Sequence, residues 1–176
     1  MNRAVFLDRD GVINRAVLRN GRPYPPSSVD ELEFLPGVSE AINALHQAGF
    51  RIIVVTNQPD VATGVQRREV VEAIHERIRH AFPIDDIKVC YHVDQDGCTC
   101  RKPKPGMLLE VATEWSLDLG QSFMVGDRWR DIEAGRAAGC RTILVKSNYA
   151  ERQAEKPDAV VSSLLEASAF ILANSV

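Results

Sequence analysis

Residues 4–11, Ala-Val-Phe-Leu-Asp-Arg-Asp-Gly, join a short apolar run to two carboxylates and a glycine. Four consecutive apolar residues are typical of a strand that is buried on both faces, as in a parallel sheet. Ligands of open α/β sheets bind beyond the carboxyl ends of the strands. We therefore expect a buried strand over 4–7, with Asp8 and Asp10 at the functional edge of a sheet.

Similar apolar runs recur along the chain and alternate with amphipathic stretches of helical length. Further strands are expected at 51–56, 87–91, 122–125, 141–145 and 159–161, and helices at 38–45, 70–78, 105–115, 129–139 and 164–174. Alternation of this kind indicates βαβ units. The sequence thus predicts an α/β fold, with a doubly wound, mostly parallel sheet, in a single domain over residues 1–176. The stretches 14–30 and 93–105 are expected to be irregular.

The composition is that of a globular protein, with 45% hydrophobic and 26% charged residues, which excludes the disordered and collagen classes. The formal net charge of -3 provides no general attraction for nucleic acid or an anionic membrane, so neither is expected as a partner. No apolar run approaches the roughly 18 residues of a membrane span, and acidic residues interrupt the N-terminal segment too early for a signal peptide. We expect a cytoplasmic protein, and a monomer because no long apolar face is left over.

Polar side chains also follow two other expected strands. Thr56, Asn57 and Gln58 come after one of them, and Asp127 and Asp131 come after another. Two carboxylates as close as Asp8 and Asp10 resist ionising together unless a cation lies between them. The pattern suggests bound Mg²⁺ or an unequal division of protons, although Asp and Gly are also ordinary residues of solvated turns.

A basic segment follows the cysteines near position 100. Arg101, Lys102 and Lys104 are carried on a backbone that two prolines restrict, Pro103 and Pro105. Cations fixed beside an acidic edge would form a receptor for a phosphate group. The alternative is a solvated basic loop.

Cysteine and histidine cluster in one short segment. Cys90, His92, Cys98 and Cys100 can complete a tetrahedron and leave no position open, which predicts a structural Zn²⁺. Reduced surface thiols or a disulfide are the alternatives. Cys140 stands apart and is expected to be a small buried apolar residue.

A second Asp-x-Asp-Gly pattern occurs at 94–97, inside the polar loop between these cysteines. No buried strand precedes it, unlike the copy that begins at Asp8. We therefore expect residues 94–97 to form a turn.

In chain order, Asp8-x-Asp10, Thr56, Lys102, and Gly126-Asp127 with Asp131 resemble the motifs of the haloacid dehalogenase superfamily of phosphatases. The resemblance implies that Asp8 is a nucleophile that forms an aspartyl phosphate, and that Asp10 is the general acid and then the general base. It also implies that Mg²⁺ binds Asp8, the main-chain carbonyl of Asp10 and Asp127, with Asp131 in a supporting role. Thr56 and Lys102 would then hold the transferring phosphate.

The zinc loop, on a chain without room for a cap domain, resembles a subgroup of that superfamily that acts on heptose bisphosphates or histidinol phosphate. Two segments are similar to segments of the heptose enzymes, namely Thr56-Asn57-Gln58-Pro59 and Cys98-x-Cys100-Arg101-Lys102-Pro103-x-Pro105-Gly106-Met107. The resemblance implies removal of the C7 phosphate of D-glycero-D-manno-heptose 1,7-bisphosphate, on the way to activated heptose for lipopolysaccharide. The implied substrate contacts are Thr56, Asn57, Gln58, Pro59, Arg101, Lys102 and Arg128.

Some residues depart from the heptose pattern. Pro59 and Asp60 stand where Ser-Gly is frequent, and Arg128 replaces a frequent Lys. The spacer between His92 and Cys98 has five residues, as in histidinol phosphatases, so histidinol phosphate is the alternative substrate. The loops at 15–30 and 93–105 are expected to shape the pocket mouth.

Functions of another class are also open to test. A phospho-acceptor signalling module would carry its phosphorylated Asp after a later strand, where this chain has its cysteine cluster. A catalytically inactive zinc-binding module is disfavoured because each acid, hydroxyl and base that the reaction needs is present.

Overall fold

The structure, a computed structural model, describes residues 2–175 and contains a six-stranded parallel sheet. The strands lie in the order β5 (Asp86–Cys90), β4 (Arg51–Asn57), β1 (Ala4–Leu7), β6 (Phe123–Gly126), β7 (Arg141–Val145) and β8 (Ala159–Val161). The helices are α1 (Val38–Gln47), α2 (Arg68–Ala81), α3 (Gly106–Trp115), α4 (Trp129–Ala138) and α5 (Leu164–Asn174). The predicted α/β fold with a parallel sheet is confirmed.

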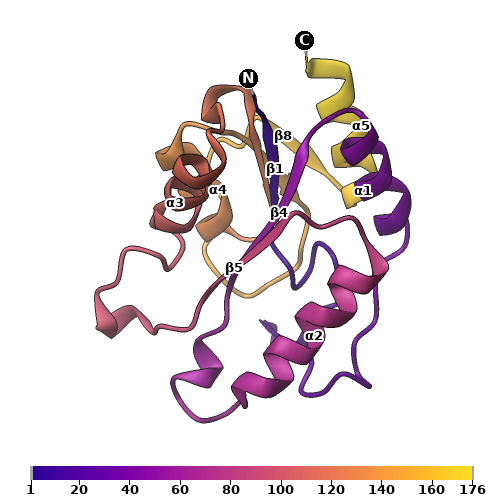
Figure 1. The fold of residues 1–176 in the computed structure, drawn as a ribbon. Coiled ribbons are helices and arrows are strands. Elements are labelled where there is room, and N and C mark those ends of the chain that lie inside the picture. The colour runs from indigo at the N-terminus through magenta and orange to yellow at the C-terminus, as the bar shows by residue number, and fades with distance from the viewer. Residues whose placement is uncertain (1, 176) are drawn as a thin grey trace.

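Helices cover both faces of the sheet (Figure 1). Val5 and Leu7 of β1 belong to the core on the face of α1, α2 and α5. Phe6 lies between them in sequence and packs on the opposite face, against Leu108 and Val111 of α3. Since successive side chains of a strand point to opposite faces, the uninterrupted apolar run of β1 supplies both cores at once.

The register of β1 determines where the polar residues meet. Leu7 pairs with Val54 of β4 on one side and with Val125 of β6 on the other. The residues that follow these three strands therefore emerge at the same edge of the sheet. This edge carries the candidate site.

The segment 14–30 is not irregular throughout, so that part of the prediction is wrong. Strands β2 (Val17–Arg19) and β3 (Arg22–Tyr24) form an antiparallel hairpin. Asn20 and Gly21 join them with φ angles of 51° and 73°. Asn-Gly is the preferred pair for a two-residue hairpin turn, because both positions need a left-handed backbone. That signal was present in the sequence.

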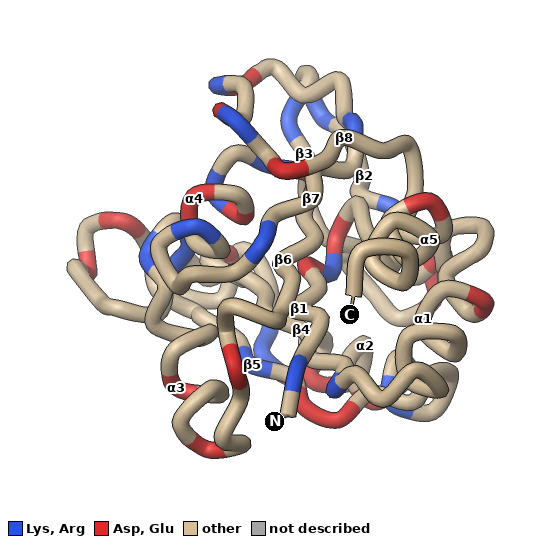
Figure 2. The backbone as a smooth tube through the Cα atoms, turned by 90° about the horizontal axis from the view of Figure 1, so that it is seen from above, with Lys and Arg blue, Asp and Glu red and all other residues tan. Residues whose placement is uncertain are grey.

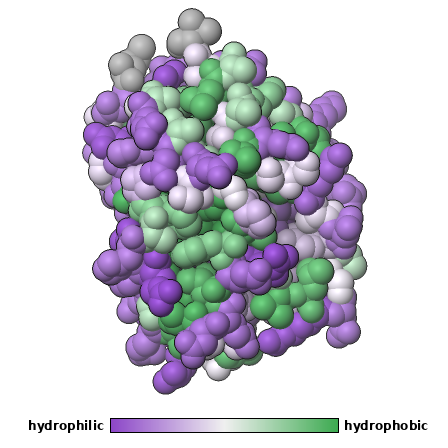
Figure 3. Space-filling view, turned by 90° about the vertical axis from the view of Figure 1, so that its right-hand side faces the viewer, coloured by the Kyte–Doolittle hydropathy of each residue, from purple (hydrophilic) through white to green (hydrophobic). Residues whose placement is uncertain are grey.

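Lys and Arg lie close to Asp and Glu at several places along the backbone (Figure 2). The face on the right of Figure 1 also carries apolar atoms among its polar ones (Figure 3). Within residues 2–175, none of the helices has the length and apolar character needed to cross a membrane.

Candidate active site

A cavity of about 460 Å³ opens at the carboxyl edge of the sheet. Its lining consists of Asp8, Asp10, Arg22, Pro23, Tyr24, Pro25, Asn57, Pro59, Asp60, Lys102, Arg128, Trp129, Arg130, Asp131, Ala150 and Glu151. The β2–β3 hairpin contributes one wall, as expected for the loop at 15–30. Of the predicted substrate contacts, Thr56, Gln58 and Arg101 lie outside this lining.

Lys102 lies between two carboxylates at the floor of the cavity. Its Nζ donates to Oδ1 of Asp8 at 2.8 Å and to Oδ1 of Asp131 at 2.6 Å. Burial would lower the pKa of Lys102, but the charges of Asp131 and Asp8 outweigh it and raise the pKa. Lys102 therefore stays a cation beside the carboxylate of Asp8.

Asp8 itself is buried at the end of β1. Burial and the negative charge of Asp131 raise its pKa to about 6, while Lys102 acts in the opposite direction. A carboxyl with this pKa is mostly ionised at neutral pH, and a further cation nearby would favour the ionised form. The environment is compatible with a carboxylate nucleophile.

Asp127 completes a group of three buried carboxylates. One oxygen from each of Asp8, Asp127 and Asp131 lies within 4.8 Å of the others. Burial and the charges of Asp8 and Asp131 raise the pKa of Asp127 well above its usual value. Its Oδ1 is buried and has no hydrogen-bond partner among residues 2–175. A hard divalent cation fits this donor set, because it would bind the unpaired oxygen and offset the repulsion.

Two glycines allow the carboxylates to approach one another. A Cβ on Gly126 would lie 2.1 Å from Cβ of Asp131, and one on Gly11 would lie 1.8 Å from Oδ2 of Asp127. Gly11 also has a φ of 87°, which other residues rarely adopt. Both positions therefore require glycine for reasons of space.

Asp131 has both oxygens engaged. Its Oδ1 accepts from Lys102, and its Oδ2 accepts from the main-chain N–H of Arg128 at 3.0 Å, at the start of α4. The second contact is an N-terminal cap, as its place in the first helical turn suggests. Asp131 therefore fixes Lys102 to the helix.

Asp10 points toward a different set of partners. It accepts from Nε and Nη2 of Arg9, from Asn14 at 3.0 Å and from Gln58 at 2.9 Å. Burial would raise the pKa of Asp10, but the Arg9 guanidinium and these hydrogen bonds lower it. Asp8 and Asp10 thus have pKa values shifted in opposite directions, and the shifts favour the ionised form of Asp10 over that of Asp8.

Arg9 and His75 were missed by the sequence reasoning. Arg9 is fully buried between the two aspartates in sequence, and its Nη1 lies 3.0 Å from Nε2 of His75. Burial and the charge of Arg9 lower the pKa of His75 to about 3, so the imidazole is neutral and accepts from Arg9. A charged residue placed between Asp8 and Asp10 was the available signal for Arg9, whereas His75 on α2 offered none.

The Thr56–Gln58 segment reaches the site mainly through other residues. The amide of Asn57 donates to the carbonyl of Lys102 and accepts from its N–H, both at 3.1 Å. Gln58 donates to Thr56 Oγ1 and to Asp10, each at 2.9 Å. Asn57 therefore holds the backbone of Lys102, and Gln58 links Thr56 to Asp10.

The two arginines predicted to contact substrate are paired with acids. Arg128 donates to both carboxylate oxygens of Glu151, and Nε of Arg101 donates to Asp94 at 2.8 Å. Asp94 also accepts from Arg130 at 3.2 Å. Residues 94–96 form the predicted turn, and Asp94 additionally ties two arginines to it. Asp94, Arg130 and Glu151 were not among the predicted residues.

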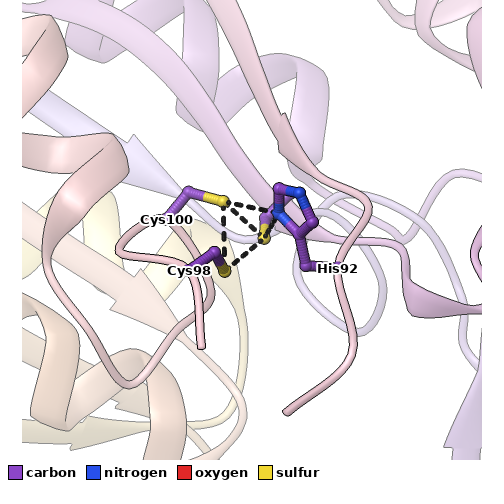
Figure 4. Close-up of side chains that lie close together, drawn as sticks. His92, Cys98 and Cys100 are labelled. Carbon is purple, nitrogen blue, oxygen red and sulfur yellow. Dashed lines mark hydrogen bonds between the residues drawn. The ribbon is translucent and has the colours of Figure 1, made fainter. Parts of the chain in front are cut away.

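The four predicted zinc ligands converge (Figure 4). The sulfur of Cys98 lies 3.7 Å from that of Cys90 and 3.5 Å from that of Cys100, and the sulfurs of Cys90 and Cys100 are 2.7 Å apart. Nδ1 of His92 lies 3.6 Å from the Cys90 sulfur and 3.3 Å from the Cys100 sulfur. Tetrahedral Zn²⁺, with Zn–S bonds of about 2.3 Å, separates its sulfurs by about 3.8 Å. The structure forms no disulfide among these cysteines, and three thiols with one imidazole are a donor set that fits a tetrahedral metal.

Comparisons with known proteins agree with this geometry. Residues 99–167 match the HAD-hydrolase-like family model. The chain is 40% identical over 158 residues to the D-glycero-beta-D-manno-heptose-1,7-bisphosphate 7-phosphatase of Pseudomonas aeruginosa, a match that covers 87% of this chain and 86% of that protein. The corresponding protein of Rhodopseudomonas palustris is 37% identical over 148 residues, 77% of this chain and 79% of the relative.

Among solved structures, the D,D-heptose 1,7-bisphosphate phosphatase of B. bronchiseptica, complexed with magnesium and phosphate, superimposes with a TM-score of 0.80 at 31% identity. The match covers 97% of this chain and 98% of that one. The enzyme from Burkholderia thailandensis gives a TM-score of 0.70 at 28% identity, over 98% of this chain and 100% of the other. The similarity therefore extends over nearly the whole chain.

Proposed function

The chain belongs to the haloacid dehalogenase-like phosphatases, and we propose that it removes the C7 phosphate of D-glycero-beta-D-manno-heptose 1,7-bisphosphate. The observation that carries the proposal is the near full-length 40% identity to a phosphatase named for that substrate. The contacts of Lys102 with Asp8 and Asp131 support the reaction type independently.

Asp8 is the proposed nucleophile. Its carboxylate attacks phosphorus in line with the departing sugar oxygen and forms an aspartyl phosphate, which water then hydrolyses. Lys102, 2.8 Å from Asp8 Oδ1, is placed to stabilise the negative charge of the transferring group. Thr56, the penultimate residue of β4, has a hydroxyl that accepts from Gln58 and is proposed as a second phosphate contact.

Asp10 is the proposed acid and base. The negative charge of a bound phosphate raises the pKa of a neighbouring carboxyl, which favours the protonated form needed to protonate the leaving oxygen. After the sugar leaves, Asp10 is ionised and can take a proton from the attacking water. The hydrogen bonds from Arg9, Asn14 and Gln58 support the ionised form in this second half.

Mg²⁺ is the proposed cofactor at Asp8, Asp127 and the main-chain carbonyl of Asp10, because Asp127 offers a buried unpaired oxygen. When bound, it supplies positive charge that offsets the repulsion between Asp8 and the phosphate. Asp131 is proposed to act on Lys102, since both of its oxygens are already occupied by other donors.

Zn²⁺ is the proposed structural metal at Cys90, His92, Cys98 and Cys100. The last ligand immediately precedes Arg101 and Lys102, and the carbonyl of Cys98 accepts from Lys104 at 2.6 Å. An ordered loop would therefore fix the approach of Lys102 to Asp8. The metal has no open position for substrate, so its role is to hold the backbone.

The rest of the cavity supplies contacts for a charged sugar. Arg22, Arg128 and Arg130 line it together with Pro59 and Asp8. Arginine is suited to bind phosphate through two parallel hydrogen bonds. We propose that the second phosphate of the substrate lies among these arginines.

The substrate is tested by measuring kcat/KM side by side for heptose 1,7-bisphosphate and histidinol phosphate, with Mg²⁺ present. We expect the bisphosphate to be preferred by at least about 10-fold, since it carries a second phosphate that the cavity arginines can bind, and hydrogen bonds to charged groups contribute roughly 1.5–3 kcal/mol. A preference for histidinol phosphate would reject the proposed substrate but would agree with the proposed phosphatase reaction. A stable phosphoprotein that never turns over would reject the phosphatase and favour a signalling module.

A further inference from the structure

A tyrosine outside the sequence motifs contacts the carboxylate proposed to bind magnesium. The hydroxyl of Tyr149 donates to Oδ2 of Asp127. Tyr149 follows β7, far from Asp127 in sequence, and the hydrogen bond lies in a half-buried environment. The other oxygen of Asp127, Oδ1, is the one that has no partner within the described part of the chain. Oδ2 of Asp127 is therefore hydrogen-bonded to the tyrosine, and Oδ1 is left to bind a cation.

The segment that carries Tyr149 is held to its surroundings on both sides of the tyrosine. Ser147 Oγ donates to the main-chain carbonyl of Asp127 at 3.0 Å, and the N–H of Ala150 donates to the carbonyl of Gly21 at 2.8 Å. Glu151 then pairs with Arg128. The phenol is therefore presented by a backbone tied both to the motif that contains Asp127 and to the β2–β3 hairpin.

Space for this contact is provided by Gly11. A Cβ at position 11 would lie 1.8 Å from Asp127 Oδ2 and 2.7 Å from the Tyr149 hydroxyl. The glycine that follows Asp10 therefore lies against the hydrogen bond itself. The contact therefore supplies a reason for glycine in addition to the φ of 87°.

We propose that Tyr149 is a positioning residue for magnesium, which holds Oδ2 of Asp127 and leaves Oδ1 free for the cation. The inference rests on the magnesium site of the proposed function. Carboxylates that bind metals are commonly hydrogen-bonded through their second oxygen, and removal of such a partner typically lowers metal affinity about 10- to 100-fold. The tyrosine keeps the buried carboxylate in one orientation before the cation arrives.

The test compares the dissociation constant for Mg²⁺ in the full-length, zinc-loaded protein and in Tyr149→Phe, by calorimetry without substrate. We expect binding to weaken at least about 10-fold in Tyr149→Phe. The Mg²⁺ concentration for half-maximal activity should rise by the same factor, and kcat at saturating Mg²⁺ should stay within about threefold of the wild-type value. Weaker Mg²⁺ binding with a nearly unchanged kcat is expected if Tyr149 positions a metal ligand. General damage to the site would lower kcat as well.

Tyr91→Phe is the matched control, because Tyr91 stacks with Arg68 and makes no contact with Asp127. Its Mg²⁺ affinity should equal that of the wild type. Asp127→Asn should bind Mg²⁺ at least about 100-fold more weakly. If Asp127→Asn loses binding while folded Tyr149→Phe binds Mg²⁺ as the wild type does, or more tightly, the role of Tyr149 is rejected and the metal site stands. If Asp127→Asn binds normally, the proposed metal site itself is wrong.

The phenylalanine ring keeps the shape of the tyrosine, and folding is verified by circular dichroism and by the unfolding midpoint. If Tyr149→Phe does not fold, Tyr149→Leu provides the second variant, since it also removes the hydroxyl and leaves Asp127 and Gly11 unchanged. Weaker Mg²⁺ binding in folded Tyr149→Leu supports the proposal, and unchanged binding contradicts it.

Discussion

Nζ of Lys102 lies 2.8 Å from Oδ1 of Asp8, although 94 positions separate the two residues in sequence. The same ammonium group donates to the carbonyl of Val55 at 2.8 Å, which anchors it to the neighbouring strand. A buried cation is thereby fixed beside a buried carboxylate. Removal of either partner has consequences that can be predicted.

Asp8→Asn should abolish turnover and preserve the fold. The amide cannot attack phosphorus, so kcat should fall by at least about 10⁴-fold. Lys102 keeps its ion pair with Asp131, and one of three crowded carboxylates is removed. We therefore expect the unfolding midpoint without Mg²⁺ to remain within about 5 °C of the wild-type value or to rise.

The control is Asp86→Asn, at the start of β5, which should keep full activity. Activity of Asp8→Asn above about one percent of the wild type, in protein shown by mass spectrometry to retain the amide, would contradict the role of Asp8.

Asn57→Ala tests how the position of Lys102 is maintained. Asn57 makes two hydrogen bonds to the backbone of Lys102, and their loss leaves an N–H and a carbonyl unpaired. We expect the free energy of unfolding to fall by about 1–3 kcal/mol and kcat/KM to fall about 10- to 100-fold. Denaturant unfolding and steady-state kinetics measure both effects.

Asn43→Ala serves as the comparison, because Asn43 bonds only to Ser39 on the exposed side of α1. Wild-type kinetics in Asn57→Ala would show that Lys102 is positioned without this amide.

Cys98→Ser should remove zinc and loosen the loop that leads to Lys102. Elemental analysis should find close to one zinc per chain in the wild type and much less in the variant, since structural zinc sites depend on the complete set of four ligands. We expect faster proteolysis of the loop and a higher KM. Cys140→Ser alters a thiol outside the cluster and should retain its zinc. If well-folded wild-type protein contains no zinc, the proposed structural metal is wrong.

His75 should make the fold sensitive to acid. Its pKa is lowered to about 3 from an ordinary value of 6.5, first by burial and then by Arg9. The folded state therefore favours the neutral ring. The contribution of His75 to the free energy of unfolding is complete above pH 6.5 and is lost as the pH falls toward 3. The slope approaches about 1.4 kcal/mol per pH unit for one proton.

Between pH 6.5 and 4.5, the wild type should lose about 2–3 kcal/mol more than His75→Gln, whose side chain can still accept from Arg9. Denaturant unfolding at several pH values measures the difference. His46 is exposed at the end of α1, so His46→Gln should follow the wild type. If the free energy of unfolding changed with pH equally in the wild type and in His75→Gln, the buried neutral state of His75 would be contradicted.

The sequence predicted the sheet because its strands are apolar on both faces and are bounded by polar turns. The convergence of Asp8, Lys102 and Asp127 followed from their places after strands or in the loop beyond. The zinc cluster was predictable from its spacing and donor types. The hairpin at 17–24 was missed, although Asn20-Gly21 is a local signal that could have revealed it.

Partners that act through other residues were not predictable in the same way. The contacts of His75 with Arg9 and of Tyr149 with Asp127 depend on how distant elements pack. His75 and Tyr149 have unremarkable local sequences, with no repeated spacing or motif around either residue. Asp94 had a visible pattern, but only the fold brings Arg101 and Arg130 to it.

The covalent role of Asp8 is tested most directly by the stereochemical course at phosphorus. A phosphomonoester made chiral with sulfur and oxygen isotopes is hydrolysed in labelled water, and the configuration of the released thiophosphate is determined. Each in-line displacement inverts the phosphorus, so attack by Asp8 followed by attack by water predicts overall retention. Overall inversion would mean that water attacks the substrate directly, and would contradict an aspartyl phosphate.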